Sequence, residues 1–221
     1  MKYAVVTPSR GLIHSRTVEA VLGQAAAHEN VGWYFTHDLP IPECHERVTE
    51  MGLRSGADAL WFIEEDVIPP LDALAESMIL LRSFDAVAVD YPVGSVREAW
   101  GCAVRDDDAH VLWCGLGCTL VRAEVFRKVP RPWFSTDARY VHKDGEWKAL
   151  PVTAPHAERW GQQDIHFGIE MARLGLHIGV VPGMIAGHAH VEQMGKEGSN
   201  VGFHEVIVCR RILREYPGVP A

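Results

Sequence analysis

Three consecutive acidic residues, Glu64, Glu65 and Asp66, follow directly after the apolar segment 59–63. Ligands of open α/β sheets bind beyond the carboxyl ends of the strands, so an acidic run at this point suits a ligand site. Because side chains of an extended segment alternate, Glu64 and Asp66 would face one way and Glu65 the other. Two carboxylates on one face could share Mg²⁺ or Mn²⁺, but an acidic turn that only solvates a strand end explains the run equally well.

A histidine and an aspartate further along the chain are the next candidates for chemistry. His188 follows the last apolar strand pattern, where its imidazole would complete a mainly oxygen coordination sphere and favour Mn²⁺ over Mg²⁺. Asp164 follows a small-residue turn at a helix start, which is a suitable place for a general base. Taken alone, each has a simpler explanation, since the chain has 12 histidines and an Asp at a helix start is commonly a cap.

Alternating strand and helix patterns must position these residues. Apolar strand patterns cover 3–6, 31–35, 59–63 and 85–89, and helical patterns begin after a Ser15 or Thr17 cap, at 43 and after Pro69-Pro70. Further along we expect antiparallel strands at 101–104 and 110–121, a long insertion at 131–160 with a hairpin at Asp144-Gly145, a helix at 163–174, a strand at 177–181 and a helix at 204–216. This order predicts an α/β fold with a mixed central sheet flanked by helices.

Two glycines, Gly115 and Gly117, interrupt the expected strand at 110–121. Glycine weakens a strand and usually marks close approach by a ligand or by another backbone, so a sugar or acceptor would fit there. The neighbouring cysteines, Cys114 and Cys118, lack the paired spacing of a zinc site, which favours a packing role for them.

Composition restricts the class of protein. The chain has 221 residues, 48% hydrophobic and 23% charged, which suits one folded domain. Its net charge of -8 and the lack of a basic stripe argue against nucleic acid as a partner. Five scattered cysteines and no secretory pattern indicate free thiols in the cytoplasm, and no apolar stretch approaches the roughly 20 residues of a membrane span. Neither a dinucleotide-binding nor a phosphate-binding glycine loop is present.

The order of these motifs resembles the GT-A glycosyltransferases, in particular small bacterial and phage-borne enzymes of the family 2 type. Segment 5–10 looks like the first strand and base-binding loop, 44–47 like the Arg-bearing helix, and 59–66 like the strand that ends in the D-x-D motif. Segment 115–122 resembles the strand beside the sugar pocket, and 161–164 the acidic motif that supplies the base. Glu64 stands where the family has its first Asp, and Gln163 where it has an acid.

The resemblance implies a metal-dependent transfer of a sugar from a nucleoside-diphosphate sugar, UDP- or GDP-linked, to an acceptor hydroxyl of a sugar, protein or small molecule, with inversion. Residues 1–90 would form the nucleotide-binding half and 91–221 the acceptor and catalytic half. Asp164 would be the catalytic base, and Glu64, Asp66 and His188 would hold Mn²⁺ or Mg²⁺. Substrate binding would fall to Thr7, Pro8, Arg10, Asp38, Arg47, Glu65, Gly115 and Gly117. The glycine-rich segment 194–202 would be a lid ordered by the donor.

Three other functions compete with this interpretation. A nucleotidyltransferase on a related sheet also uses strand-end carboxylates and a metal, but normally has a more glycine-rich, basic first loop. A non-catalytic carbohydrate-binding or scaffold protein would keep the fold and would not need Asp164. A metal-dependent hydrolase would use the same histidine and carboxylates, although the helical H-E-x-x-H motif is absent.

Overall fold

The computed structural model describes residues 1–9, 11–27, 31–94, 99–105, 110–143, 146–151, 163–194 and 202–208. The helices are α1 (Ser15–Ala25), α2 (Glu43–Arg54), α3 (Ala73–Leu80), α4 (Val125–Lys128) and α5 (Gln163–Arg173). The central strands are β1 (Tyr3–Thr7), β2 (Val31–Phe35), β3 (Ala59–Ile63), β5 (Ala86–Asp90), β8 (Ala103–Arg105), β9 (Val111–Cys114), β10 (Cys118–Arg122) and β13 (Ile178–Ile185).

These eight strands form one mixed sheet in the order β2-β1-β3-β10-β5-β13-β9-β8. β1 is parallel to β2 and β3, and β13 is parallel to β5, whereas β10 is antiparallel to both of its neighbours and β9 is antiparallel to β13 and β8. β3 and β5 therefore end at the same edge of the sheet. The expected α/β class with a mixed central sheet is confirmed.

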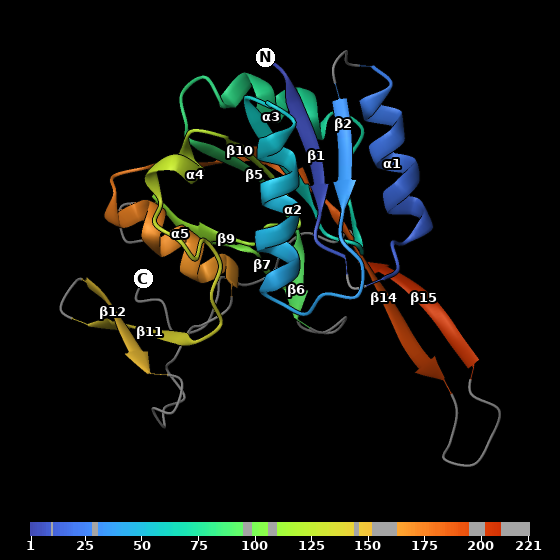
Figure 1. Cartoon of the computed structure of the whole chain (residues 1–221). Helices are drawn as coiled ribbons and strands as arrows, with labels where there is room; N and C mark the ends of the chain where they lie inside the picture. The colour runs from blue at the N-terminus through green and yellow to red at the C-terminus, as the bar shows by residue number, and fades with distance from the viewer. Residues whose placement is uncertain are drawn as a thin grey trace.

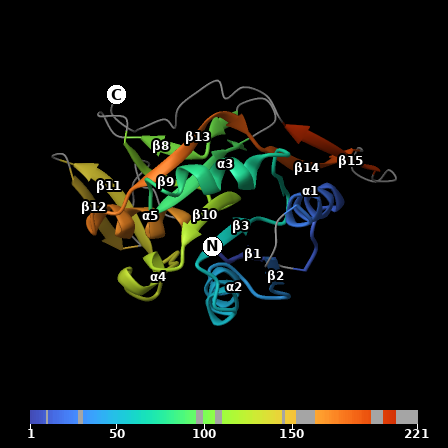
Figure 2. The same ribbon diagram turned by 90° about the horizontal axis from the view of Figure 1, so that it is seen from above.

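Helices cover both faces of the sheet, and the residues of β3 show how the two cores are divided. Leu60 and Phe62 belong to the core beneath α2, α4 and α5, and Trp61 and Ile63 to the core beneath α1 and α3. Figure 2 shows α2 and α3 on opposite sides of the sheet. All five residues of β3 are buried, as expected of a central strand with helices on both faces.

Shorter strands are attached to this body. β6 (Pro92–Gly94) pairs with β7 (Ala99–Gly101), and β11 (Ala138–Lys143) with β12 (Glu146–Pro151). A third sheet has the order β15-β14-β4, formed by β4 (Val67–Ile68), β14 (Gly187–Met194) and β15 (Gly202–Val208). The β11–β12 and β14–β15 hairpins project from opposite sides of the body (Figure 1). Within the described ranges, no helix is both long and apolar enough to cross a bilayer.

The structure corrects three expectations about the elements. Residues 202–208 form a strand paired along β14, not the start of a helix, because the β-branched run Val206-Ile207-Val208 suits a sheet better than a helix. The segment 110–121 is two strands, β9 and β10, separated by the turn that contains the two glycines. The cap of α1 is His14, whose Nδ1 accepts from the backbone N–H of Arg16.

The remaining expected elements are present within a few residues of their predicted ends, including the hairpin in the insertion. Four cysteines, Cys44, Cys102, Cys114 and Cys118, are buried and free, which confirms free thiols for these residues. Residues 209–216 of the expected last helix, Cys209, and residues 195–201 of the expected lid lie outside the described residues.

Helix α5, which carries Asp164, packs closely on β9 at Gly168. A Cβ atom at Gly168 would lie 2.7 Å from the backbone Cα of Trp113 and closer still to its Cβ. Real Cβ atoms do not approach so closely, so any larger residue must push α5 away from the sheet. The glycine therefore sets the distance between α5 and Trp113 of β9.

We expect Gly168→Ala to lower the free energy of unfolding by about 1–3 kcal/mol, because overpacking forces the backbone to shift. Gly23→Ala is the matched control: Gly23 is also helical, but an added Cβ would meet nothing within 4 Å. It should raise the free energy of unfolding by about 0.5–1 kcal/mol through helix propensity. Urea denaturation of both variants measures the difference; equal effects would contradict close packing at Gly168.

Candidate functional site

A cavity of about 270 Å³ lies at the edge of the sheet where β3 and β5 end. Its lining includes Glu64, Tyr91, Trp113, Gln163, Asp164 and His188. Glu64 comes from the end of β3, Tyr91 from the end of β5, and Asp164 from the first turn of α5. Four of the sequence candidates, Glu64, Gly115, Asp164 and His188, therefore line one cavity, which lies beyond the end of β3 where the acidic run is found.

The carboxylate of Glu64 lies between two buried side chains. Its Oε2 is 3.5 Å from the hydroxyl of Tyr91, and its Oε1 is 3.8 Å from Nε2 of His45. Burial by itself lowers the pKa of His45, but the contacts with Cys44 and Glu64 outweigh it and raise that pKa to about 9. At neutral pH the imidazole is therefore charged and pairs with Glu64.

Asp164 is a partly buried carboxylate with a raised proton affinity. Burial raises its pKa from 3.8 to about 6, and the nearby negative charge of Glu64 adds to the rise. One oxygen, Oδ1, accepts a hydrogen bond of 2.9 Å from the backbone N–H of Ile165. A carboxylate with a pKa near 6 is mostly ionised at pH 7 but is a stronger base than an exposed aspartate, as general base catalysis requires.

Asp66 and His188 form a second pair beside the cavity. His188 Nε2 is 3.4 Å from Asp66 Oδ2, and His188 Nδ1 is 2.7 Å from the carbonyl oxygen of Pro92. Since a carbonyl oxygen only accepts, Nδ1 must donate to it, which directs Nε2 to Asp66. Burial lowers the pKa of His188, but the contact with Asp66 and the carbonyl of Pro92 raise it overall.

This pair fits part of a divalent metal site. A histidine that ligates a metal usually donates its other ring N–H to a carbonyl or carboxylate, as His188 does to Pro92. Mg²⁺ and Mn²⁺ sites at substrate phosphates often use only one or two protein carboxylates and complete the shell with phosphate oxygens and water. In the part of the chain that the structure describes, no three His, Cys, Asp or Glu side chains form a ready-made metal cluster. The residues thus suit a cation that is shared with a substrate.

Glu65 points away from the cavity and supports the loop after β1. Its Oε2 accepts a hydrogen bond of 3.0 Å from Ser9 Oγ, which in turn accepts from the backbone N–H of Gly11 at 3.0 Å. Asp38, with a positive φ of 53°, lies close to Gly11, since a Cβ there would be 3.6 Å from Asp38 Oδ1. The structure therefore brings Glu65 and Asp38 to one loop.

The other described candidates for nucleotide binding, Thr7, Pro8 and Arg47, are not among the residues that line the cavity. Thr7 and Pro8 are buried at the end of β1, and Thr7 Oγ1 accepts from the indole N–H of Trp33 at 3.0 Å. Arg10 lies outside the described residues. Arg47 lies on α2 with 55% of its side chain exposed, and pairs with Glu50 at 3.5 Å.

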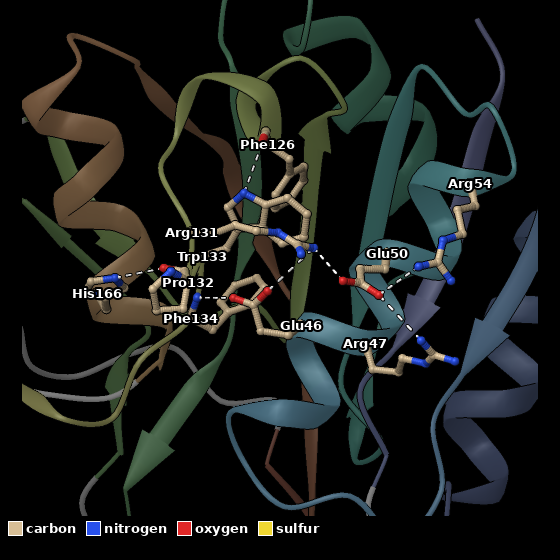
Figure 3. A network of polar contacts seen from close by, with 10 residues as sticks. All are labelled: Glu46, Arg47, Glu50, Arg54, Phe126, Arg131, Pro132, Trp133, Phe134 and His166. Carbon is tan, nitrogen blue, oxygen red and sulfur yellow. Dashed lines mark hydrogen bonds and ion pairs between the residues drawn. The ribbon is translucent and has the colours of Figure 1, made fainter.

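Arg47 belongs to a network of charged residues on the outer face of α2 (Figure 3). Arg131 donates to Glu50 at 2.7 Å and stacks on the ring of Trp133 at 4.0 Å. Glu46 accepts from the backbone N–H of Phe134 at 2.9 Å. These contacts attach the start of the 131–160 insertion, residues 131–134, to α2. The network therefore has a structural role.

Gly115 and Gly117 are close to the ring of Tyr91. A Cβ at Gly115 would lie 2.8 Å from Tyr91 Cζ and 3.2 Å from Cys102 Cβ, and one at Gly117 would lie 2.7 Å from Tyr91 Cζ. The backbone N–H of Gly117 donates to the Tyr91 hydroxyl at 3.2 Å. The close approach that these glycines permit is therefore made by a protein side chain, and Gly115 also lines the cavity.

Sequence reasoning missed three residues of the site: His45, Tyr91 and Trp113. Tyr91 directly follows β5, so the rule that placed the acidic run at a strand end could have indicated it as well. His45 lay inside a helix assigned to nucleotide binding through its arginine, and Trp113 inside an expected strand. No local pattern shows that His45 contacts Glu64 or that Trp113 lines the cavity.

The raised pKa of Asp164 predicts an effect on stability. Because its folded-state pKa exceeds the unfolded value, protonation favours folding, and this contribution is lost as the pH rises from about 4 to about 6. At pH 7, Asp164→Asn should raise the free energy of unfolding by about 1–3 kcal/mol, and the gain should shrink toward pH 4. Urea denaturation at several pH values measures it. Asp72→Asn, at an exposed helix start without a side-chain cap, is the control and should show little change.

Comparison with known proteins shows likeness at the level of the fold. No protein-family model and no curated protein matches the chain. Among solved structures, the chain is similar to the one described as "Crystal Structure of A197 from STIV". The two share 16% identity over 98% of each chain, with a TM-score of 0.61. At this identity the match shows a shared fold over nearly the whole chain.

Proposed function

We propose that this protein is a metal-dependent glycosyltransferase of the GT-A type, which moves a sugar from a nucleoside-diphosphate sugar to an acceptor hydroxyl. One observation carries the proposal: Glu64, Asp164 and His188, from three separate segments, line one cavity at the carboxyl ends of β3 and β5, with Asp66 beside His188. This is the edge at which sheets of this class bind ligands. The motif order in the sequence adds support for the GT-A form.

The cavity has the composition of a site for a polar ring compound. Val93, Trp113 and Ile165 contribute apolar residues to its lining, and Gln163, Glu64 and Asp164 contribute hydrogen-bonding groups. Ligand sites typically combine aromatic surface with a few polar groups that fix orientation. The volume of about 270 Å³ is enough for one sugar ring and not for a whole nucleotide sugar. The nucleotide would then lie outside it, toward the loop after β1, where Glu65 bonds Ser9 and Asp38 lies close to Gly11.

Asp66 and His188 would hold the divalent cation, Mn²⁺ or Mg²⁺. When bound, the cation supplies a positive charge that stabilises the departing diphosphate. His188 is directed to this place by the carbonyl of Pro92, and Asp66 is 39% exposed in its side chain, so both can reach a substrate phosphate. Oxygens of a substrate phosphate would complete the coordination shell of the cation, for which the described residues offer no third His, Cys, Asp or Glu.

Asp164 would act as the general base. It would take the proton of the acceptor hydroxyl while that oxygen forms a bond to the anomeric carbon and the bond from this carbon to the diphosphate oxygen breaks. The nucleoside diphosphate leaves with the bonding electrons, and attack from the opposite face inverts the anomeric carbon. A base with a pKa of about 6 is largely ionised at neutral pH and therefore ready to accept the proton.

Calorimetry with UDP, GDP, CDP and dTDP, each with and without Mn²⁺, tests the donor site. We expect one or two of these to bind only with Mn²⁺, and Asp66→Ala to weaken this binding at least about tenfold, since a ligand to the cation is lost. The control is Glu124→Ala, which removes an exposed carboxylate paired with Lys128 at the start of α4. Binding of none of the four would favour the scaffold alternative over the transferase.

Turnover tests the role of Asp164. With the donor identified, Asp164→Asn should reduce kcat by about 10²–10⁴-fold while the nucleoside diphosphate still binds, because general base catalysis typically contributes this much. In the wild type, kcat should rise with pH up to about 6 and then level off, as Asp164 loses its proton. Initial rates from pH 5 to 8 measure both. Unchanged kcat in Asp164→Asn would remove Asp164 from the base role.

A further inference from the structure

The two oxygens of Glu64 each face a different buried residue. Neither of these two residues has a role in the transfer reaction described above. His45 lies 3.8 Å from Oε1 and the Tyr91 hydroxyl 3.5 Å from Oε2. His45 is 2% exposed and Tyr91 3%. They come from different elements, α2 and the end of β5, and meet at one carboxylate. Burying polar groups costs free energy of folding unless they are paired, so the meeting of both residues at Glu64 indicates a role for these contacts.

His45 is oriented to present one nitrogen to Glu64. Its Nδ1 is 3.3 Å from Cys44 Sγ, and its ring packs against Phe134 with centroids 5.4 Å apart. Its Nε2 is buried without a hydrogen-bond partner in the described structure, and leaving such an atom unpaired destabilises the folded state. The ion pair with Glu64 offsets this cost and thereby fixes the direction of the Glu64 side chain.

Tyr91 is oriented to donate to Glu64. Its hydroxyl accepts from the backbone N–H of Gly117 at 3.2 Å, so the hydroxyl proton is free to point elsewhere. Burial, followed by the charge of Glu64, raises the pKa of Tyr91 well above 10, so the proton stays in place. The acceptor in reach of this proton is Glu64 Oε2. Gly115 and Gly117 leave room for the ring, so the position of the hydroxyl is set by packing.

We propose that His45 and Tyr91 are positioning residues that hold Glu64 as a fixed carboxylate of the sugar-binding cavity, outside the coordination shell of the cation. The inference rests on the proposed function and refines it: Asp66 and His188 serve the metal, and Glu64 serves the substrate beside Asp164. Each carboxylate oxygen has about two acceptor sites, so Glu64 can still accept from a substrate hydroxyl while it is held. Among the described residues, Glu64 forms no three-ligand cluster with Asp66 and His188, which places its carboxylate apart from that pair.

Nuclear magnetic resonance of the full chain labelled with ¹⁵N-histidine tests the holding contacts without any metal. His45→Gln identifies the ring signals of His45 by their loss. We expect Glu64→Gln to shift these signals clearly, and Asp66→Asn to shift those of His188 and leave those of His45 in place. If Glu64→Gln does not fold, Tyr91→Phe, which frees one oxygen of Glu64, should shift the same signals. His45 signals unchanged in whichever of these variants folds would overturn the inference.

Titration with Mn²⁺ alone, followed by electron paramagnetic resonance, tests the separation of Glu64 from the metal. Glu64→Gln should keep the Mn²⁺ dissociation constant within about twofold of wild type, and Asp66→Asn should raise it at least about tenfold. Equal weakening in both variants would overturn the inference. Wild type that binds no Mn²⁺ would contradict the metal dependence in the proposed function, while the histidine spectra would still decide whether Glu64 is held.

Discussion

The packing of the Tyr91 ring against the glycine turn between β9 and β10 is the constraint on which the rest of the site depends. Only residues without a side chain fit at 115 and 117, because an added Cβ would collide with the ring. The ring closes one wall of the cavity, and its hydroxyl bridges the turn and Glu64. Asp90 links the end of β5 to the segment before β8, since its Oδ1 accepts from the backbone N–H groups of Tyr91 at 3.0 Å and Cys102 at 2.8 Å. The end of β5 is thus fixed before any ligand arrives.

Electrostatics and stability oppose each other in this cavity. Glu64 and Asp164 are partly buried in the same cavity, and the raised pKa of Asp164 reflects the cost of charging it there. The charged imidazole of His45 lowers that cost, and the pKa of His45 is itself raised by its contacts with Cys44 and Glu64. A protein selected for stability alone would not retain two such carboxylates, and strongly shifted pKa values gather at functional sites for this reason.

The charged network on α2 explains how α2 and the segment 131–134, which are far apart in sequence, are held together near the site. Glu46 and Glu50 bind the backbone of Phe134 and the side chain of Arg131, while Trp133 donates to the carbonyl of Phe126 at 2.9 Å. Phe134 then packs against His45 of α2 and, with ring centroids 5.3 Å apart, against Phe167 of α5. Exposed ion pairs add little stability singly, but here they fix a segment whose aromatic residue joins the two helices of the site.

Local patterns in the sequence determined the elements of the N-terminal half and the place of the acidic run. The apolar run of β3 and the helical spacing of α2 arise from contacts that repeat along the chain, so the sequence alone indicates them. The helix expected from residue 204 is wrong for residues 204–208, because these residues pair along β14, a contact that local spacing does not show. The partners of Glu64 were equally hidden, since His45 and Tyr91 lie far from it in sequence. Only the tertiary structure decides such contacts, because the sheet order and the faces covered by α2 and α5 set which buried side chains meet.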